Sequence, residues 1–126
     1  VAAIRGVSSG GFLNRIKEYE NQDVKAELQP LKNTLITMTH RYETVLQMLK
    51  DKNAPEIYDF HARRLVEMIG NIVIGYLLVL DANRCDAFQQ EARIFVGMGN
   101  AQNQEKESFI KEFSENDLAA YKAIKE

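Results

Sequence analysis

The sequence predicts an all-α fold, an up-and-down bundle of about four helices. Residues 68–80 form an almost wholly apolar run that carries a single amide, Asn71. Over residues 28–49, apolar side chains recur at alternating spacings of three and four, which is typical of one face of a helix. The β-branched residues of the apolar run are continuous and lack turn signals at strand spacing, so we expect no strand. Together these observations favour a helical bundle.

The length and composition fit one globular domain. The chain has 126 residues, of which 45% are hydrophobic and 27% charged, enough for a core without disulfides or metals. The net charge is −2 and the basic residues form no block, so we expect no nucleic-acid partner. A single cysteine, Cys85, excludes an intrachain disulfide framework and fits a reducing compartment, so we expect a cytoplasmic protein.

The amino-terminal end is interpreted as a boundary. Residues 8–11 are serine and glycine, which favour turns, and we assign residues 1–11 to a junction with an upstream domain. Residues 12–126 are assigned to a single helical-bundle domain. The sequence does not begin with Met, which suggests a processed chain or a piece of a longer protein. A short first helix is expected over residues 12–21, and it needs packing to be stable.

The second helix is predicted from a seam of seven apolar residues, and Pro30 suits its first turn because proline lacks the N–H that a first turn leaves unused. Residues 51–53 are expected to end this helix. The seam consists of Leu28, Leu31, Leu35, Met38, Tyr42, Val45 and Leu49.

The third helix is expected over residues 55–83, through the apolar run. That run has about 13 residues, short of the roughly 20 that a spanning helix needs, so we expect no membrane span. A helix that is apolar nearly all round must be covered on every side. Gly70 and Gly75 each cost about 1 kcal/mol relative to Ala in a helix, and they predict close approach of a neighbouring helix.

A fourth helix is predicted to begin at Asp86, with Gln89 completing a capping box. Residues 100–107 are polar on all sides, so we expect the helix to protrude or fray there. Ser114 and Asp117 predict the cap of a short tail helix. The expected mutually packed core consists of Leu35, Met38, Tyr42, Ile69, Ile72, Tyr76 and Phe95.

Histidine and cysteine give no candidate site. A di-iron bundle needs Glu-x-x-His, whereas Thr37 and Tyr58 stand three residues before His40 and His61. Both histidines are therefore interpreted as polar-face or boundary residues. Cys85 has no CxxC partner or neighbouring base and is interpreted as a small packing residue.

Two further features have a structural and a functional interpretation. Arg63 and Arg64 could grip a phosphate or carboxylate, but nearby acids (Glu56, Asp59 and Glu67) favour a solvated salt-bridge face. Asn71 is expected to be buried and to fix helix register, with a ligand contact as the alternative. Residues 97–100 are glycine-rich but do not follow a strand, so a nucleotide loop is not predicted. No catalytic, cofactor-binding or metal-binding residue is therefore assigned.

Three segments carry a resemblance to a known family. These are residues 28–49, the glycine-interrupted residues 65–80, which include the turn from Gly75 to Leu78, and residues 88–96. In this pattern the chain resembles the extra C-terminal helical domain of some bacterial acyl-CoA dehydrogenases.

The resemblance implies an oxidoreductase parent that oxidises acyl-CoA to 2-enoyl-CoA, with FAD as the acceptor and a Glu as the base. In the family that base lies in a Tyr-Glu-Gly-Thr-like segment before the extra domain, and no such segment occurs here. The resemblance therefore implies a non-catalytic fragment without a cofactor of its own, whose partners are the upstream catalytic domains. A free-standing helical interaction or scaffold protein is the alternative.

Apolar side chains on the first helix and the tail exceed what a three-helix core can cover. We expect them to dock on the catalytic body or a neighbouring subunit, with a homodimer as one expected state. The alternative is that both segments cap the ends of one bundle. The expected docking residues are Phe12, Ile16, Tyr19, Phe109, Phe113, Tyr121 and Ile124.

Overall fold

The computed structural model describes residues 10–125, and within this part of the chain all regular structure is helical. The all-α prediction is confirmed, with five α-helices in the described residues instead of about four. Residues 1–9 of the expected junction lie outside them. The elements are α2 (Gly11–Glu20), the 3-10 turn η1 (Ala26–Leu28), α3 (Gln29–Asp51), α4 (Pro55–Arg84), the 3-10 turn η2 (Asp86–Phe88), α5 (Gln89–Glu112) and α6 (Glu115–Lys125).

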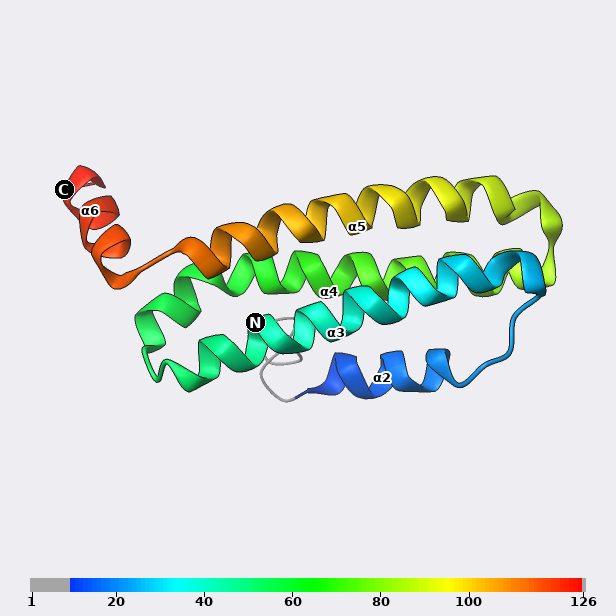
Figure 1. Ribbon diagram of the computed structural model, residues 1–126, viewed down its shortest axis with the longest axis horizontal. Coiled ribbons are helices and arrows are strands. Elements are labelled where there is room, and N and C mark those ends of the chain that lie inside the picture. The colour runs from blue at the N-terminus through cyan, green and yellow to red at the C-terminus, as the bar shows by residue number, and fades with distance from the viewer. Residues whose placement is uncertain (1–9, 126) are drawn as a thin grey trace.

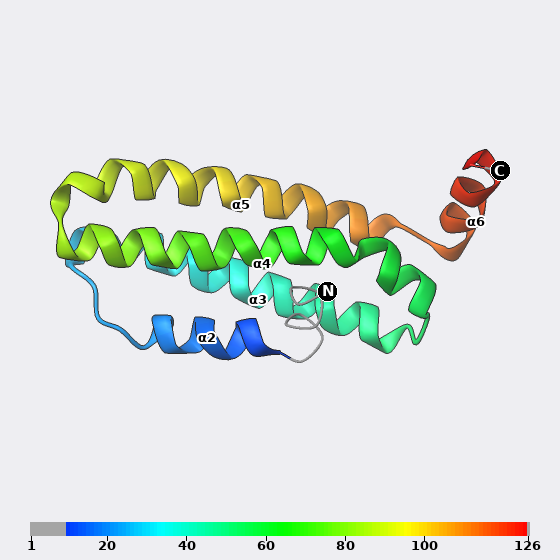
Figure 2. The same cartoon turned by 180° about the vertical axis from the view of Figure 1, so that it is seen from behind.

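Three long helices form the body of the molecule. Helices α3, α4 and α5 lie side by side and alternate in direction, while the shorter α2 runs along one flank (Figures 1 and 2). Helix α6 lies beyond the end of α5 and turns away from the long axis. The expected up-and-down arrangement is therefore confirmed.

Helix α4 is the axis of the bundle, because α2, α3 and α5 all pack against it. Its inner face is buried along nearly the whole helix, from Ile57 to Ala82. The outer face is open, however, with Ile74 46% and Leu77 44% exposed. The expectation that α4 is covered on every side is thus wrong. The physical reason is that α2 has only ten residues and α6 lies beyond the bundle end, so one side of α4 keeps no cover.

The predicted seam of α3 forms the opposite wall of the core. Six of its seven residues are buried, and Leu31 is half-buried. Of the seven predicted core residues, six are buried, but Phe95 is only half-buried. Its neighbour Val96 takes the inward position on α5, so the prediction for Phe95 is wrong.

Helix ends follow the local chemistry of the sequence. Pro30 and Pro55 stand in the first turns of α3 and α4. Asn53, in the turn between these helices, has a φ of 50°, a left-handed conformation that Asn tolerates better than most residues. Ser114 and Asp117 form the predicted capping box of α6, since each side chain accepts the other residue's backbone N–H at 3.2 Å or less.

Helix α5 differs from the prediction at both its start and its polar segment. Asp86 begins the turn η2 instead of capping α5, and its carboxylate pairs with Lys25 Nζ at 2.8 Å. Residues 100–107 neither protrude nor fray, because α5 is continuous from Gln89 to Glu112. Asn103 and Ile110 continue its buried stripe through this segment.

One helix in the described residues, α4, is long and apolar enough to cross a membrane by length and composition. Half of its apolar window is buried inside the bundle. The central helix of a globular bundle meets the same criterion, so this is weak evidence for a span.

Candidate functional site

An aromatic cluster surrounds His61 near the end of the bundle that carries α6. The His61 side chain on α4 is fully buried, and its ring centroid lies 5.1 Å from Phe60, 5.8 Å from Phe109 and 5.0 Å from Phe113. Among the described residues, neither ring nitrogen has a hydrogen-bond partner. The interpretation of His61 as a boundary residue is therefore wrong, because its spacing of four from Ile57 and Leu65 places it on the inner stripe of α4.

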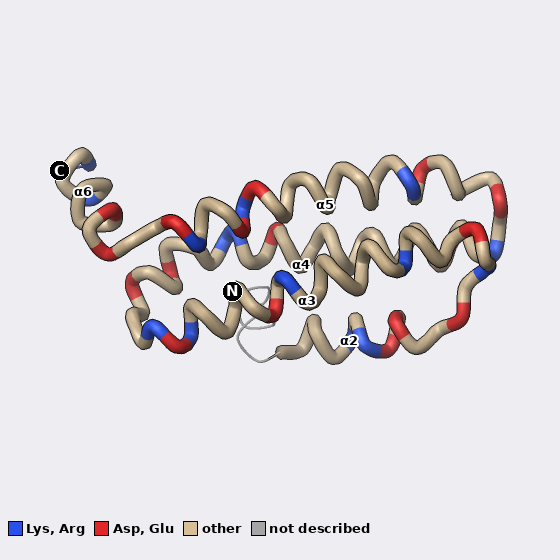
Figure 3. Tube along the Cα trace, in the orientation of Figure 1, with Lys and Arg blue, Asp and Glu red and all other residues tan. Residues whose placement is uncertain are grey.

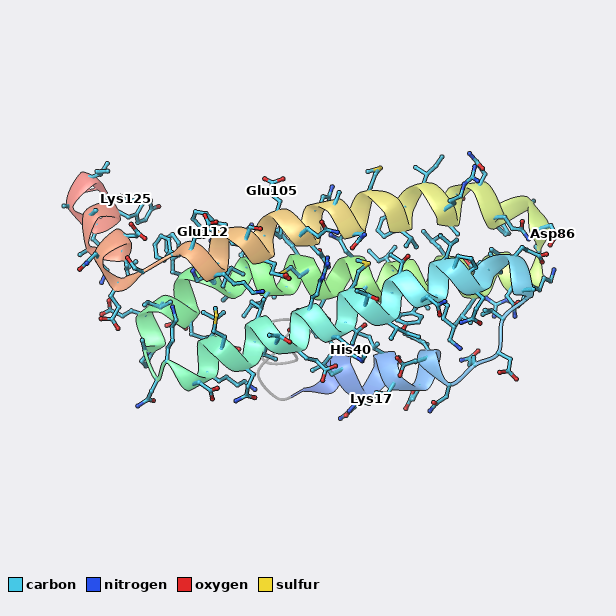
Figure 4. The ribbon with its side chains drawn as sticks, in the orientation of Figure 1. Lys17, His40, Asp86, Glu105, Glu112 and Lys125 are labelled. Atoms are coloured by element: carbon cyan, nitrogen blue, oxygen red, sulfur yellow. The ribbon has the colours of Figure 1, made fainter. Side chains whose placement is uncertain are left out.

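The surroundings of His61 keep its ring neutral. Burial, together with the smaller effect of the positive charges of Arg64 and Lys52, lowers the pKa of His61 to about 4. At neutral pH the imidazole is thus an uncharged core group, and among the described residues it has no hydrogen-bond donor or acceptor as a partner. His40, by contrast, is exposed on α3, as expected (Figure 4).

Arg64 closes the outer side of this cluster. Its guanidinium carbon lies 5.1 Å from the ring centroid of Phe60 and 4.6 Å from that of Phe109. Its Nη1 donates a hydrogen bond to the Phe60 carbonyl at 3.2 Å. The guanidinium therefore stacks on aromatic rings, a favourable cation–π geometry.

The expected salt-bridge face around Arg63 and Arg64 does not form. Glu56 pairs with Lys122 of α6, and Glu67 pairs with Lys106 of α5 at 3.7 Å. Within residues 10–125 the structure records no ion pair of either arginine. The prediction fails at Glu56 and Glu67 because these acids meet lysines of other helices, which sequence spacing along one helix does not reveal.

An amide cluster joins α4 to α5. Asn71 Nδ2 donates to Gln102 Oε1 at 3.1 Å and to Asn103 Oδ1 at 3.0 Å, and Asn103 Nδ2 donates to the Met68 carbonyl at 3.0 Å. Asn103 is only 5% exposed, whereas Asn71, expected to be buried, is half-buried. The cluster fixes the register of the two helices, because a shift of either would leave buried amide groups unpaired.

A close approach of the two helices accompanies the amide cluster. A Cβ added at Gly99 of α5 would lie 3.3 Å from the Asn71 Cβ, tighter than ordinary contact. The glycine therefore lets the amides reach each other. Asn103 was missed by the sequence analysis, although its spacing from Ala92, Val96 and Gly99 continues the helical stripe.

Cys85 and the glycine-rich residues 97–100 take no part in these clusters. Cys85 is exposed at the end of α4, so its interpretation as a packing residue is wrong. Residues 97–100 lie within α5 and form no loop. Across residues 10–125 there is no group of three or more His, Cys, Asp or Glu that could hold a metal ion.

The expected docking residues divide into three groups, the first of which, Phe12 and Tyr19, is half-buried. Ile16 and Phe113 are buried inside the chain, and the Phe113 ring stacks on Phe60 with a centroid distance of 4.6 Å. For these two residues the docking expectation is wrong and the end-capping alternative holds. Phe109, Tyr121 and Ile124 stay exposed.

Apolar side chains are also exposed in the middle of α4, which the sequence predicts to be covered, and in the middle of α5. Besides Ile74 and Leu77 on α4, the side chains of Ile94 and Met98 on α5 are more than half exposed. Charged residues are concentrated toward the ends of α4 and α5, and the central stretches of both helices are free of them (Figure 3). Exposed apolar surface, where it is contiguous, is typical of sites that contact other molecules.

The chain is similar to known proteins of one family. The family described as acyl-CoA dehydrogenase C terminal matches residues 8–118. The chain is also similar to the crystal structure of the acyl-CoA dehydrogenase family protein from Porphyromonas gingivalis, with 41% sequence identity and a TM-score of 0.85. That match covers 90% of this chain and 99% of the other. A comparison with curated proteins gives no match.

Proposed function

We propose, from the premise that this chain belongs to the acyl-CoA dehydrogenase C-terminal domain family, that it is the non-catalytic helical domain of a flavin-dependent acyl-CoA dehydrogenase. The family expected from residues 28–49, 65–80 and 88–96 is confirmed by the match over residues 8–118. The proposed role is packing against the catalytic domains of the same chain, or assembly of subunits.

The observation that carries this role is the exposed apolar face of α4. Ile74 and Leu77 would lose contact with water if another protein surface covered them. Burial of apolar area contributes roughly 25 cal/mol per Å², so cover of this surface is favourable. The core clusters, in contrast, are turned inward: His61 is closed off by aromatic rings, and the amides of Asn71 and Asn103 satisfy each other.

Among the described residues, the cavity between α4 and α6 does not fit a flavin. This cavity of about 300 Å³ is lined by Glu56 and Glu115, whose carboxylates would repel the diphosphate of FAD. The lysine at this cavity, Lys122, is already paired with Glu56. We therefore propose that FAD is held by other domains of the parent enzyme.

The test uses the parent enzyme with and without residues 12–126. Deletion is expected to change the sedimentation coefficient or the thermal stability of the parent enzyme. Flavin absorbance and acyl-CoA-dependent dye reduction are expected to persist in the remaining domains, provided that they fold. The isolated chain is expected to show neither a flavin absorption band nor dye reduction with acyl-CoA. A flavin band or turnover in the isolated chain would overturn the non-catalytic assignment.

A free-standing helical interaction protein is the second candidate. It is favoured by one observation: the similar crystal chain is covered to 99%, so it consists of little besides this bundle. The full reading frame separates the two candidates. Several hundred upstream residues with flavin-binding motifs would support the enzyme domain, and their absence would support the free-standing protein.

A further inference from the structure

A small apolar hollow lies on the outer face of α4, beside the start of α2. Its volume is about 150 Å³, and none of its lining residues is charged. Gly70 contributes to its floor, and a Cβ added there would meet no atom within 4 Å. The hollow is lined by Phe12, Val66, Ile69, Gly70, Val73 and Ile74.

Packing within residues 10–125 does not account for Gly70. Glycine destabilises a helix interior, and Gly70 stands in the middle of a 30-residue helix. Gly75 has an internal reason, because an added Cβ would lie 2.6 Å from Leu35 Cδ2. The expectation of a close neighbouring helix is therefore confirmed for Gly75 and wrong for Gly70 within one chain. A bare helix backbone at an apolar surface allows close approach by another molecule.

Two protruding side chains stand next to this hollow. Ile74 and Leu77 follow Gly70 by four and seven residues, which places them about 6 and about 10 Å further along the same helix. Both are more than two-fifths exposed. One face of α4 thus carries a projection and a recess side by side. Two copies of such a face can be self-complementary when a two-fold axis relates them, because each projection then meets the other copy's recess.

The charge distribution favours a second copy over a charged partner. No charged residue occurs between Glu67 and Asp81, so the centre of this face is neutral (Figure 3). Both ends carry mixed signs: Glu67 pairs with Lys106 at one end, and Asp81 with Arg84 at the other. A two-fold pairing would place neutral centre on neutral centre and mixed end on mixed end, without a cluster of like charges.

We propose that this face of α4 pairs with the same face of a second copy of the chain, with Ile74 and Leu77 of each copy entering the hollow at Gly70 of the other. The inference deepens the proposed assembly role and rests on it. The uncharged stretch is about 20 Å long. A contact of that length along one helix lies at the small end of protein interfaces, so the isolated chain should form a weak dimer.

Sedimentation velocity on the intact chain tests this pairing with two matched glycine variants. Gly97 on α5, like Gly70, has no atom within 4 Å of an added Cβ, so both Gly70→Leu and Gly97→Leu should fold and gain helix stability. Wild type is expected to shift from monomer to dimer between about 1 µM and about 1 mM. Gly70→Leu fills the recess and should raise the dimer dissociation constant about tenfold or more, whereas Gly97→Leu should change it less than about threefold.

A second matched pair checks the projection. Ile74 and Ile94 are both about half exposed on long helices. Ile74→Asp should weaken the dimer about tenfold or more by burying a charge, and Ile94→Asp should have little effect. A wild type that stays monomeric over the whole range, or equal weakening by both members of a pair, overturns the proposal.

The parent enzyme separates failure of this inference from failure of the proposed function. If the isolated chain is a monomer but Gly70→Leu impairs assembly of the parent, the face docks on the catalytic body. The self-pairing is then wrong and the assembly role stands. If Gly70→Leu and deletion of residues 12–126 both leave the parent unchanged, the assembly role itself fails.

Discussion

Asn103 of α5 donates a hydrogen bond from its side-chain amide to the backbone carbonyl of Met68 on α4, at 3.0 Å. The same side chain accepts a hydrogen bond from Asn71, also at 3.0 Å. One amide thus ties two helices together at a point where it is almost fully shielded from water. Polar groups in such places contribute more to uniqueness of packing than to gross stability.

Asn103→Ala should lower the free energy of unfolding by about 1–3 kcal/mol, because it removes two hydrogen bonds and leaves the Asn71 amide without its inner partner. Urea denaturation provides the measurement. Asn100→Ala is the matched control, since Asn100 is half-buried on the same helix and its side chain has no recorded hydrogen bond to any of residues 10–125. Its loss should stay within about 0.5 kcal/mol. Equal losses in the two variants would contradict a specific role for Asn103.

The two glycines of α4 should respond to alanine with opposite signs. At Gly75 the new methyl group would press on Leu35, which is fully buried, and the strain should outweigh the gain in helix propensity by about 1 kcal/mol or more. At Gly70 the added Cβ meets nothing, so Gly70→Ala should stabilise the monomer by about 0.5–1 kcal/mol. Thermal melts at low protein concentration separate the two effects. A gain at Gly75 would show that the core is looser than the structure indicates.

Two isoleucines two residues apart on α4 test the distinction between its inner and outer faces. Ile72 is fully buried and Ile74 is 46% exposed. Ile72→Ala should cost about 2–5 kcal/mol through lost burial and the cavity that remains. Ile74→Ala should cost less than about 1 kcal/mol in the monomer. A loss below about 0.5 kcal/mol for Ile72→Ala in denaturant melts would mean that α4 is not the axis of the core.

The long helices were predictable because their signals are local. The alternating three–four spacing from Leu28 to Leu49 defines one face of α3 without any knowledge of its neighbours. Pro30 and Pro55 mark helix starts through their own geometry, and Ser114 with Asp117 marks another. Features of this kind need only residue type and spacing along the chain.

The open face of α4 was not predictable in the same way. A continuous apolar run indicates that a helix can be covered on all sides. Which sides are covered depends on the length and position of α2, which the run does not reveal. Similarly, spacing along α4 predicts ion pairs between Arg63 and the acids near it, whereas in the structure Glu67 forms an ion pair with Lys106 of α5. In both cases the missing information is the placement of another helix.

The candidate clusters could have been found in part. His61 and Asn103 were judged by residue type, as polar groups that belong at the surface, although both continue an apolar stripe at helical spacing. Spacing was the better guide at these positions. No sequence signal, however, indicated that Phe60, Phe109 and Phe113 would meet around His61, because they come from α4 and from the far end of α5.

Buried His61 should make the free energy of unfolding depend on pH. Its pKa is about 4 in the folded chain and 6.5 for a free histidine, so the unfolded chain binds more protons between these values. The free energy of unfolding should therefore be highest above about pH 6.5 and fall as the pH drops toward about 4, by up to about 3 kcal/mol.

His61→Phe keeps a ring among the aromatic neighbours and removes the titrating group. The variant should be at least as stable as wild type at pH 7, because both nitrogens of His61 lack partners in the described structure. Urea denaturation at pH 7 and about pH 4.5 gives the comparison, with exposed His40→Gln as the control. Wild type and His40→Gln should lose stability in parallel, and His61→Phe should lose distinctly less. If all three decline equally, the imidazole of His61 is not the group that the fold holds neutral.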